Sequence, residues 1–366
     1  MREVRVALDL FGSDGHPEVE IEAIERALAR DPALHVVAFG SLDASRALTA
    51  HERLVVQDAP YGVPMDAAPS YAVRNLADSA MSRGLAALGR GEVDAFVSAG
   101  NTGAVLAFSL RHVRRIAGIP RPAIAVILPS KNRETVLLDA GANAECKAEF
   151  LLGFARIGSA LARAVIDTDK PTVGLVNIGE EETKGDSLRK EAFALLAANV
   201  ERFVGNVEPT HLLDGRVSVL VTDGFSGNLM LKTLEGAVAT MTGIIKEALT
   251  RNVAGKVAGL LARSSLKREL SRFDYEKYGG SLLAGLDKPV VIAHGRSTPQ
   301  ALANALLFAA RVARADMASL IQGQLAGTGA EGEVAASQPT DESQAGDARR
   351  TKRAQGRETA EPGRLF

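Results

Sequence analysis

Short apolar runs alternate with segments of helical periodicity along most of the chain. The apolar runs are rich in valine and isoleucine and nearly unbroken, which is typical of strands buried on both faces of a sheet. Residues 217–221, VSVLV, are the clearest run, and beyond Asn228 apolar residues recur with helical spacing at Leu231, Leu234 and Val238. Strands separated by helices in this way predict a mostly parallel sheet with helices on both faces.

The same patterns predict the individual elements. Strands are predicted at residues 2–9, 34–40, 54–58, 93–98, 123–128, 135–138, 171–177, 203–206, 217–221 and 289–293. Helices are predicted at residues 17–30, 44–51, 70–88, 147–165 and 299–321, with further helices ending near residues 115 and 198 and one following residue 228. The short polar segment 131–134 predicts that strands 123–128 and 135–138 form a hairpin.

The last part of the chain has a different composition. From residue 323 it is rich in Gly, Ala, Ser and Glu and contains almost no large apolar residues. Such a segment cannot bury enough apolar surface to fold. We therefore predict one folded domain at residues 1–322 and a disordered tail at residues 323–366.

Composition narrows the class of protein. The chain has 366 residues, of which 46% are hydrophobic and 24% charged, as in globular proteins with a sizeable core. A net charge of −1 and the absence of tryptophan argue against nucleic-acid binding. The single cysteine, Cys146, excludes an internal disulfide. Because the sequence also lacks a signal-peptide pattern and any long uncharged apolar run, we expect a cytoplasmic protein.

Small polar residues and glycine follow six of the predicted strands. These turns begin at Asp9, Ser98, Asp139, Asn177, Thr222 and His294. Turns use such residues for backbone reasons alone, so one turn is weak evidence. The turns that lead into strands are plainer, and the carboxyl ends of parallel strands share one edge, so we expect the six turns to converge on one cleft. Backbone N–H groups, amides, hydroxyls and a lysine in that cleft predict a phosphate or oxyanion site.

Familiar nucleotide, zinc and hydrolase motifs are absent from the sequence. No G-x-G-x-x-G follows the first strand, and neither G-x-x-x-x-G-K-[ST] nor G-x-S-x-G occurs. No His, Cys and Asp cluster has the spacing of a zinc site, so we expect no metal.

Together the turns resemble the bacterial phosphate acyltransferase family. The matching segments are residues 98–104 (SAGNTGA), 138–143 (LDAGAN), 177–185 (NIGEEETKG), 205–208 (GNVE), 222–228 (TDGFSGN), 278–280 (YGG) and 293–295 (AHG). They occur in the family's order and span about residues 4–320. Two places depart from the family's pattern: residues 9–14 read DLFGSD where the family has Asp-Ala-Met-Gly-Gly-Asp, and Leu76-Ala77 stand where it often carries two lysines.

The resemblance implies an acyltransferase domain that moves a fatty acyl group reversibly from acyl carrier protein to inorganic phosphate. The product, acyl phosphate, would supply phosphatidic acid and phospholipid synthesis through a membrane glycerol-3-phosphate acyltransferase. The implied fold is the three-layer α/β/α fold of phosphotransacetylases and isocitrate-type dehydrogenases. A homodimer without a cofactor is implied as well.

Four residues are candidates for catalysis, and each has a structural alternative. Lys184 could hold phosphate or the oxyanion, or pair with the three glutamates before it. Asn228 could donate to the oxyanion or cap a helix. Asp223 could orient Lys184 or a phosphate proton, or brace its own turn. His294 could protonate the leaving thiolate or act only as a structural hydrogen-bonding group.

Further residues are candidates for substrate binding. They are Gly12, Ser98, Asn101, Thr102, Asn143, Asn177, Gly179, Gly224, Ser226 and Gly227. Cys146 is a poor candidate for an acyl-carrying nucleophile because no base is evident near it in the sequence.

Residues 244–270 have the pattern of a basic amphipathic helical pair, which we expect to protrude at about residues 244–275. Apolar positions such as Ile245, Leu249 and Leu260 alternate with Lys246 and Arg251. This pattern suits transient peripheral contact with the anionic inner face of the cell membrane. A dimer interface, a core-facing helix or a docking face for the acidic carrier protein would explain it too.

Two other functional classes remain open from sequence. A nicotinamide-dependent dehydrogenase could have the same broad fold, but its dinucleotide fingerprint is missing. A non-catalytic carrier-protein or lipid-binding module would keep the basic helical pair and would tolerate loss of Lys184 and Asn228.

Overall fold

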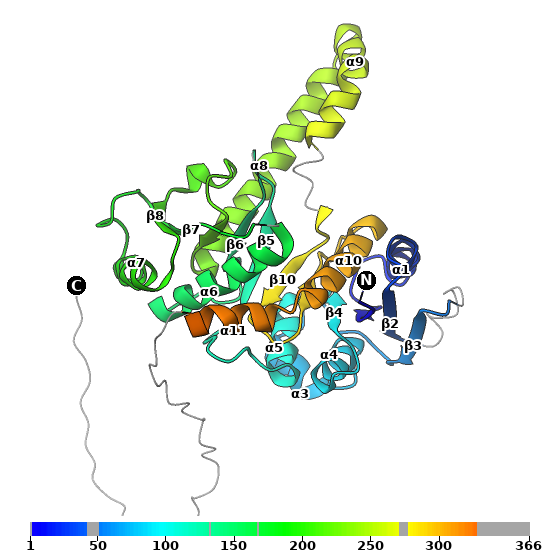
Figure 1. Ribbon diagram of the computed structural model, residues 1–366. Coiled ribbons are helices and arrows are strands. Elements are labelled where there is room, and N and C mark those ends of the chain that lie inside the picture. The colour runs from blue at the N-terminus through cyan, green and yellow to red at the C-terminus, as the bar shows by residue number, and fades with distance from the viewer. Residues whose placement is uncertain (1, 42–50, 132, 167, 271–276, 328–366) are drawn as a thin grey trace, which may run out of the picture. The chain divides into compact units, whose positions relative to one another are not determined.

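The computed structural model describes residues 2–41, 51–131, 133–166, 168–270 and 277–327 (Figure 1). The strands are β1 (Val4–Asp9), β2 (Leu34–Gly40), β3 (Leu54–Asp58), β4 (Ala95–Ser98), β5 (Ala123–Leu128), β6 (Thr135–Leu138), β7 (Val173–Val176), β8 (Phe203–Val207), β9 (Val219–Val221), β10 (Ser281–Ala284) and β11 (Val290–Ile292). The helices are α1 (Glu18–Arg30), α3 (Pro69–Asn75), α4 (Ala80–Arg90), α5 (Thr102–His112), α6 (Ala148–Leu161), α7 (Ser187–Asn199), α8 (Gly224–Thr250), α9 (Val253–Leu270), α10 (Pro299–Arg314) and α11 (Met317–Gly327). Residues 44–50 of the helix predicted at residues 44–51, and the predicted tail beyond residue 327, lie outside the described residues.

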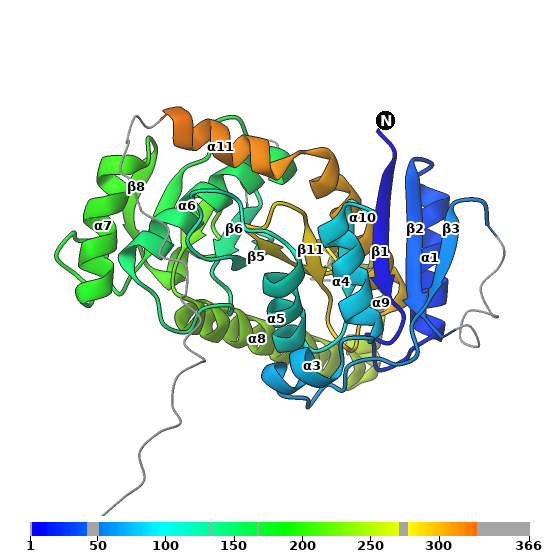
Figure 2. The same cartoon turned by 90° about the horizontal axis from the view of Figure 1, so that it is seen from below.

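The strands form one eleven-stranded sheet in the order β3-β2-β1-β4-β11-β10-β5-β6-β9-β7-β8. Figure 2 shows β3 at one end of the sheet and β8 at the other. Seven of the ten strand pairings are parallel, which confirms a mostly parallel sheet. The predicted hairpin is confirmed, because β5 and β6 pair antiparallel.

Three antiparallel pairings in the middle of the sheet change the direction of one half. They are β11 with β10, β10 with β5, and β5 with β6. As a result β6, β9, β7 and β8 run opposite to β1, β4 and β11. The prediction that all six polar turns share one edge of the sheet is therefore wrong, since it took the six strands before those turns as parallel to one another and missed β10.

Alternate strand residues pack on opposite faces of the sheet, so the fold has three layers. Val6 and Leu8 of β1 belong to the core under α1, α6, α10 and α11, whereas Ala7 belongs to the core under α4 and α5. Leu231 and Leu234 in the first turns of α8 pack over β6 and β9 on this second face. These contacts confirm the predicted three-layer α/β/α architecture.

Two predicted helices are each broken in the structure. The helix predicted at residues 70–88 is α3 followed by α4, because Ser79 caps α4 by accepting a hydrogen bond from the Ser82 N–H. The helix predicted at residues 299–321 ends at Arg314, and α11 begins after Asp316, whose φ of 46° is not helical. Since α11 continues to Gly327, residues 323–327 are helical and the tail was predicted to begin too early.

The predicted helical pair is present as the outer part of α8 together with α9, which pack against each other (Figure 1). Its apolar residues are exposed: Val253, Leu260 and Leu261 of α9 have 79%, 72% and 79% of their surface open to solvent. None of the helices described here is both long and apolar enough to cross a membrane.

Candidate functional site

Asp139, directly after β6, organises the turn that follows it. One carboxylate oxygen accepts hydrogen bonds from the N–H groups of Ile124, Gly141 and Ala142 at 2.9–3.0 Å. The other accepts from the backbone and side-chain nitrogens of Asn143 at 2.7 and 2.8 Å. Because Asp139 is fully buried, these five bonds fix the turn rigidly. Asn143 was predicted to bind substrate, but its side-chain amide donates a hydrogen bond within the chain.

The amino end of α8 packs directly on this turn. The Gly224 N–H donates to the Asn143 carbonyl at 2.8 Å. A Cβ at Gly227 would lie 1.9 Å from the Asp139 carbonyl oxygen, and one at Gly224 would lie 2.6 Å from the Asn143 carbonyl oxygen. Close backbone packing therefore explains why both positions are glycine. The role predicted for Gly224 and Gly227 was a different one, substrate binding.

Asp223 is the N-cap of α8 and lies in a buried ion pair. Its carboxylate accepts hydrogen bonds from the Ser226 N–H at 2.8 Å and the Ser226 hydroxyl at 2.9 Å. It also accepts from the guanidinium of Arg189 on α7, which donates to Ser226 Oγ at 3.0 Å. Burial raises the pKa of Asp223, but the bonds from Ser226 and the charge of Arg189 outweigh it and hold that pKa below its usual range.

This arrangement bears on the alternatives for two residues and adds a third residue. Asp223 was predicted to orient Lys184 or a phosphate proton, or to brace its own turn; its hydrogen bonds to Ser226 brace the turn, and its cationic partner is Arg189. Asn228 was considered as a helix cap, but it lies in the second turn of α8 and the cap is Asp223. Arg189 was not among the predicted site residues. The sequence held only a weak signal for it, an Asp186 three residues earlier that caps α7 and pairs with Arg189 at 3.0 Å.

Two predicted catalytic side chains are exposed beside this framework. Asn228 lies against the Gly141 backbone, with its Cβ and Cγ 3.6 Å from where a Cβ at Gly141 would stand. Lys184 is 48% exposed, and its Nζ lies 4.0 Å from Glu181 Oε1. The turn that carries Lys184 is held by Asn177, whose amide donates to the Lys184 carbonyl at 3.1 Å.

Exposed apolar side chains border these two residues. Ile178 is 81% exposed, and Phe225 and Leu229, one helical turn apart on α8, are 67% and 59% exposed. Single exposed apolar side chains are common, whereas neighbouring ones, such as Phe225 and Leu229, can contribute to a binding surface. The side of α8 next to Asn228 therefore presents apolar surface to solvent.

A second group of turns follows β1, β4 and β11. The Ser98 hydroxyl donates to Asp9 at 2.9 Å and accepts from the Gly100 N–H at 3.0 Å. Gly12 packs so closely on the turn after β4 that a Cβ at this position would lie 2.6 Å from the Ala99 nitrogen. Asn101 caps α5 through the Ala104 N–H. The predicted binding residues Gly12, Ser98 and Asn101 thus have structural partners.

Thr102 and His294 are the exposed candidates of this second group. His294 accepts a hydrogen bond at Nδ1 from the Arg296 N–H at 3.1 Å. The turns are joined because the Asp14 N–H donates to the Gly295 carbonyl at 2.7 Å and the Ala293 N–H to the Ser98 carbonyl at 2.9 Å.

Buried acids lie beneath the second group and predict a pH effect. Glu20 is fully buried, and burial raises its pKa, as does the charge of neighbouring Asp9. A raised pKa means that ionisation costs stability, so the contribution of Glu20 is favourable below its unfolded pKa and is lost as pH rises through the folded pKa.

Glu20→Gln should consequently raise the free energy of unfolding at pH 7 by about 1 kcal/mol, since the amide oxygen still accepts from the Ser13 N–H. Thermal melts between pH 4 and 8 would check this. A variant that is less stable than wild type at pH 7 would contradict it.

The two groups of turns lie on opposite edges by strand direction, and none of the hydrogen bonds or ion pairs between the described residues joins them. Sheet twist changes their relation. Adjacent strands rotate by about 20°, so the five steps from β4 to β9 accumulate about 100°. A rotation of that size would turn the carboxyl ends of β9 and β4 from opposite directions to roughly a right angle.

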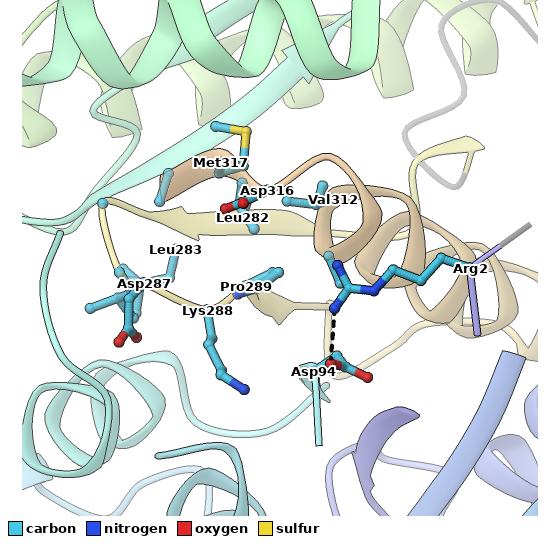
Figure 3. Close-up of a pocket in the computed structure, with 14 residues that line it drawn as sticks. Arg2, Asp94, Leu282, Leu283, Asp287, Lys288, Pro289, Val312, Asp316 and Met317 are labelled. Carbon is cyan, nitrogen blue, oxygen red and sulfur yellow. Dashed lines mark ion pairs between the residues drawn. The ribbon is translucent and has the colours of Figure 1, made fainter. Parts of the chain in front are cut away.

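A cavity of about 220 Å³ lies elsewhere, between the β10–β11 connection and the break between α10 and α11 (Figure 3). Leu282, Met317 and the Arg2–Asp94 ion pair line it. No residue predicted for the site lines this cavity. Within the described ranges, no three His, Cys, Asp or Glu side chains are placed to hold a metal ion.

Cys146 lies near the first group, with its Sγ 3.5 Å from the Asn143 carbonyl oxygen. Burial raises the pKa of its thiol to about 11. At pH 7 only about one molecule in ten thousand then carries the thiolate that nucleophilic attack requires. Cys146→Ala should retain acyl transfer within about twofold of wild type. Loss of activity in a variant with an unchanged melting temperature would contradict this.

Comparisons with known proteins identify the family. A family model described as "Fatty acid synthesis protein" matches residues 4–320. The phosphate acyltransferase of Thermoanaerobacter pseudethanolicus is 42% identical over 329 residues, covering 90% of this chain and 99% of that protein. That of Staphylococcus epidermidis is 39% identical over 305 residues, covering 83% and 93%.

Solved structures agree on the fold. A phosphotransacetylase from Streptococcus pyogenes superposes with a TM-score of 0.57 at 16% identity, covering 87% of this chain and 94% of that one. The EutD phosphotransacetylase from Staphylococcus aureus gives 0.56 at 14% identity, covering 85% and 94%. With the sequence identity above, these findings show that the chain belongs to the phosphate acyltransferase family.

Proposed function

We propose that this acyltransferase moves a fatty acyl group from acyl carrier protein to inorganic phosphate, giving acyl phosphate and the free carrier thiol. The observation that carries the proposal is the rigid framework of Asp139, Asp223 and Arg189, which leaves Lys184 and Asn228 exposed beside apolar side chains. Hydrogen-bond donors carried on a rigid framework near apolar side chains suit an acyl group that reacts with an anion.

In the proposed reaction a phosphate oxygen attacks the thioester carbonyl carbon, and the carbonyl oxygen becomes an oxyanion. The Lys184 ammonium binds phosphate, and the Asn228 amide donates to the oxyanion. When the tetrahedral intermediate collapses, the C–S bond breaks, and the thiolate takes a proton from the His294 imidazolium. Phosphate is itself a nucleophile, so positioning and electrostatic stabilisation can supply most of the rate without a covalent enzyme intermediate.

The destination of the product gives the helical pair a role in this proposal. Acyl phosphate carries a long apolar chain, and a membrane glycerol-3-phosphate acyltransferase would consume it for phosphatidic acid synthesis. The exposed Leu260 and Leu261 of α9 lie among basic residues, Lys256 and Arg263. Such a surface suits peripheral binding to anionic lipid on the cytoplasmic side.

A homodimer belongs to the proposal as well. Much of α8 is exposed, and a Cβ at Gly236 or Gly243 would meet no atom within 4 Å. Both glycines leave room for another helix to approach closely. Leu229, which is 59% exposed, lies seven residues before Gly236 and therefore on the same side of α8 as both glycines, and this side suits a second copy of the chain.

The test uses purified protein, palmitoyl-acyl carrier protein and phosphate, with hydroxylamine at neutral pH to trap acyl phosphate as the hydroxamate. Hydroxamate that forms only when phosphate is present would support the proposal. Its absence at every phosphate concentration, from protein shown to be folded, would overturn it and favour a non-catalytic carrier-protein or lipid-binding module.

A further inference from the structure

A second cavity, of about 190 Å³, has an unusual concentration of basic side chains. It lies between one face of α4, the carboxyl ends of β2 and β3 and the last turn of α5. Its lining residues are Phe39, Gln57, Asp58, Ala77, Ser82, Arg83, Ala86, Arg90, Arg111 and His112. Three arginines and a histidine thus face one carboxylate, Asp58, across a space large enough for an acidic side chain.

The arginines have partners within the chain, but these partners do not occupy all of their N–H donors. Arg83 donates to the Asp58 carbonyl at 2.7 Å and pairs with Asp78 at 3.2 Å, and Arg90 pairs with Glu92 at 2.6 Å. All these ion pairs are largely exposed, so they contribute little to stability and can exchange for another acid.

Arg111 is the least committed of the three. It donates to the Val73 carbonyl at 3.1 Å, and among the described residues it has no carboxylate partner. Burial and the positive charges of Arg111 and Arg90 lower the pKa of His112, which is the effect expected in an electropositive cavity.

We propose that this basic cavity and its rim are the docking surface for the acidic carrier protein that delivers the acyl thioester. The proposal rests on the proposed function, which names that carrier as the donor. Arginine suits the task because its planar guanidinium binds carboxylates through two parallel hydrogen bonds and is readily desolvated in an interface. Charge complementarity of this kind accelerates encounter and fixes the register of the partner.

The position of the cavity agrees with delivery to the site. The carboxyl ends of β2 and β3 lie on the same edge of the sheet as those of β1 and β4. From β3 to β4 there are three strand steps, a distance of about 14 Å. Thr102 begins α5 and Arg111 lies in its last turn, so they are about 14 Å apart along the helix, a span that a flexible thioester arm on a docked protein can cover.

The test compares two donors that carry the same palmitoyl thioester, one on carrier protein and one on free pantetheine. The double variant Arg90→Gln/Arg111→Gln removes two charges and leaves Arg83, which supports the Asp58 turn. Arg26→Gln on α1 is the matched control, since Arg26 is exposed and paired with Glu22. We expect the double variant to raise KM for the carrier-protein donor about tenfold, with kcat changed less than about twofold. Kinetics with palmitoyl-pantetheine should be unchanged.

Three results would overturn the docking surface: an unchanged KM for the carrier donor, an equal loss with both donors, or a raised KM for phosphate alone, which would make the cavity a small-anion site. Failure of the proposed function looks different, because wild type would then form acyl phosphate from neither donor. In that case binding of unacylated carrier protein to the wild type and the double variant, measured by fluorescence anisotropy, still decides the docking surface, and equal affinity would overturn it.

Discussion

Arg189→Ala should lower the free energy of unfolding by about 3 kcal/mol and remove most of the acyl transfer. The Arg189 and Asp223 side chains are only 14% and 7% exposed, so alanine leaves a buried carboxylate without its cation. That carboxylate caps α8 and holds Ser226, two residues before Asn228. Loss of the guanidinium therefore loosens the start of α8 as well as its attachment to α7. Chemical denaturation and the hydroxamate assay would measure the two effects.

Conservative variants separate the charge from the geometry. Arg189→Lys keeps the cation but cannot bind Asp223, Ser226 and Asp186 together, so we expect an intermediate loss of stability. Asp223→Asn on the Arg189→Ala background removes the unpaired charge and should recover part of the stability. If Arg189→Ala were as stable as wild type, the ion pair would not hold the site together.

The sign of the pH effect follows from the pKa of Asp223. Because that pKa is below its usual range, the stability that Asp223 contributes is present above its unfolded pKa and is lost as pH falls through the folded value. The acid-induced loss of stability in wild type should therefore be steeper than in a variant without the pair.

Local patterns in the sequence carried enough information for most of the architecture. Apolar runs such as those of β2 and β5 were predicted with their observed bounds, since a buried strand needs apolar residues on both faces. Polar, glycine-rich turns at strand ends also located the residues that surround Asp139 and Asp223.

The direction of the strands and the partners of distant residues could not be predicted from local sequence patterns. β10 has only four residues, Ser281–Ala284, and its antiparallel pairing with β5 and β11 is a long-range property that no local pattern encodes. The ion pair between Arg189 and Asp223 joins residues 34 positions apart. The need for glycine at position 227 could not be predicted from local sequence for the same reason. It arises from a backbone contact with Asp139 that only the tertiary structure creates.

The same limitation applied to the candidate site. Asn143, Ser98 and Asn101 are of the residue types that bind anions, but their polar atoms are taken by the turns they stabilise. Types and spacing cannot distinguish an amide that faces a ligand from one that faces its own backbone. Exposure makes that distinction here, and it leaves Lys184, Asn228, Thr102 and His294.

Lys184→Ala should reduce kcat for phosphate-dependent acyl transfer by about a hundredfold or more, with little change in melting temperature. The side chain is 48% exposed, so its removal opens no cavity and leaves no buried charge. The loss should be accompanied by a higher KM for phosphate, because the ammonium is proposed to bind that substrate. Lys184→Arg keeps the positive charge and should retain part of the binding of phosphate.

Glu181→Gln is the control that separates catalysis from simple ion pairing. If Lys184 served only to pair with Glu181, whose Oε1 lies 4.0 Å from its Nζ, removal of either charge should have the same effect. A role in the reaction predicts the opposite, since Glu181→Gln frees the ammonium and should leave kcat unchanged or slightly raised. Equal losses in Glu181→Gln and Lys184→Ala would contradict the catalytic role, and the framework around Asp139 and Asp223 would then serve Asn228 without the lysine.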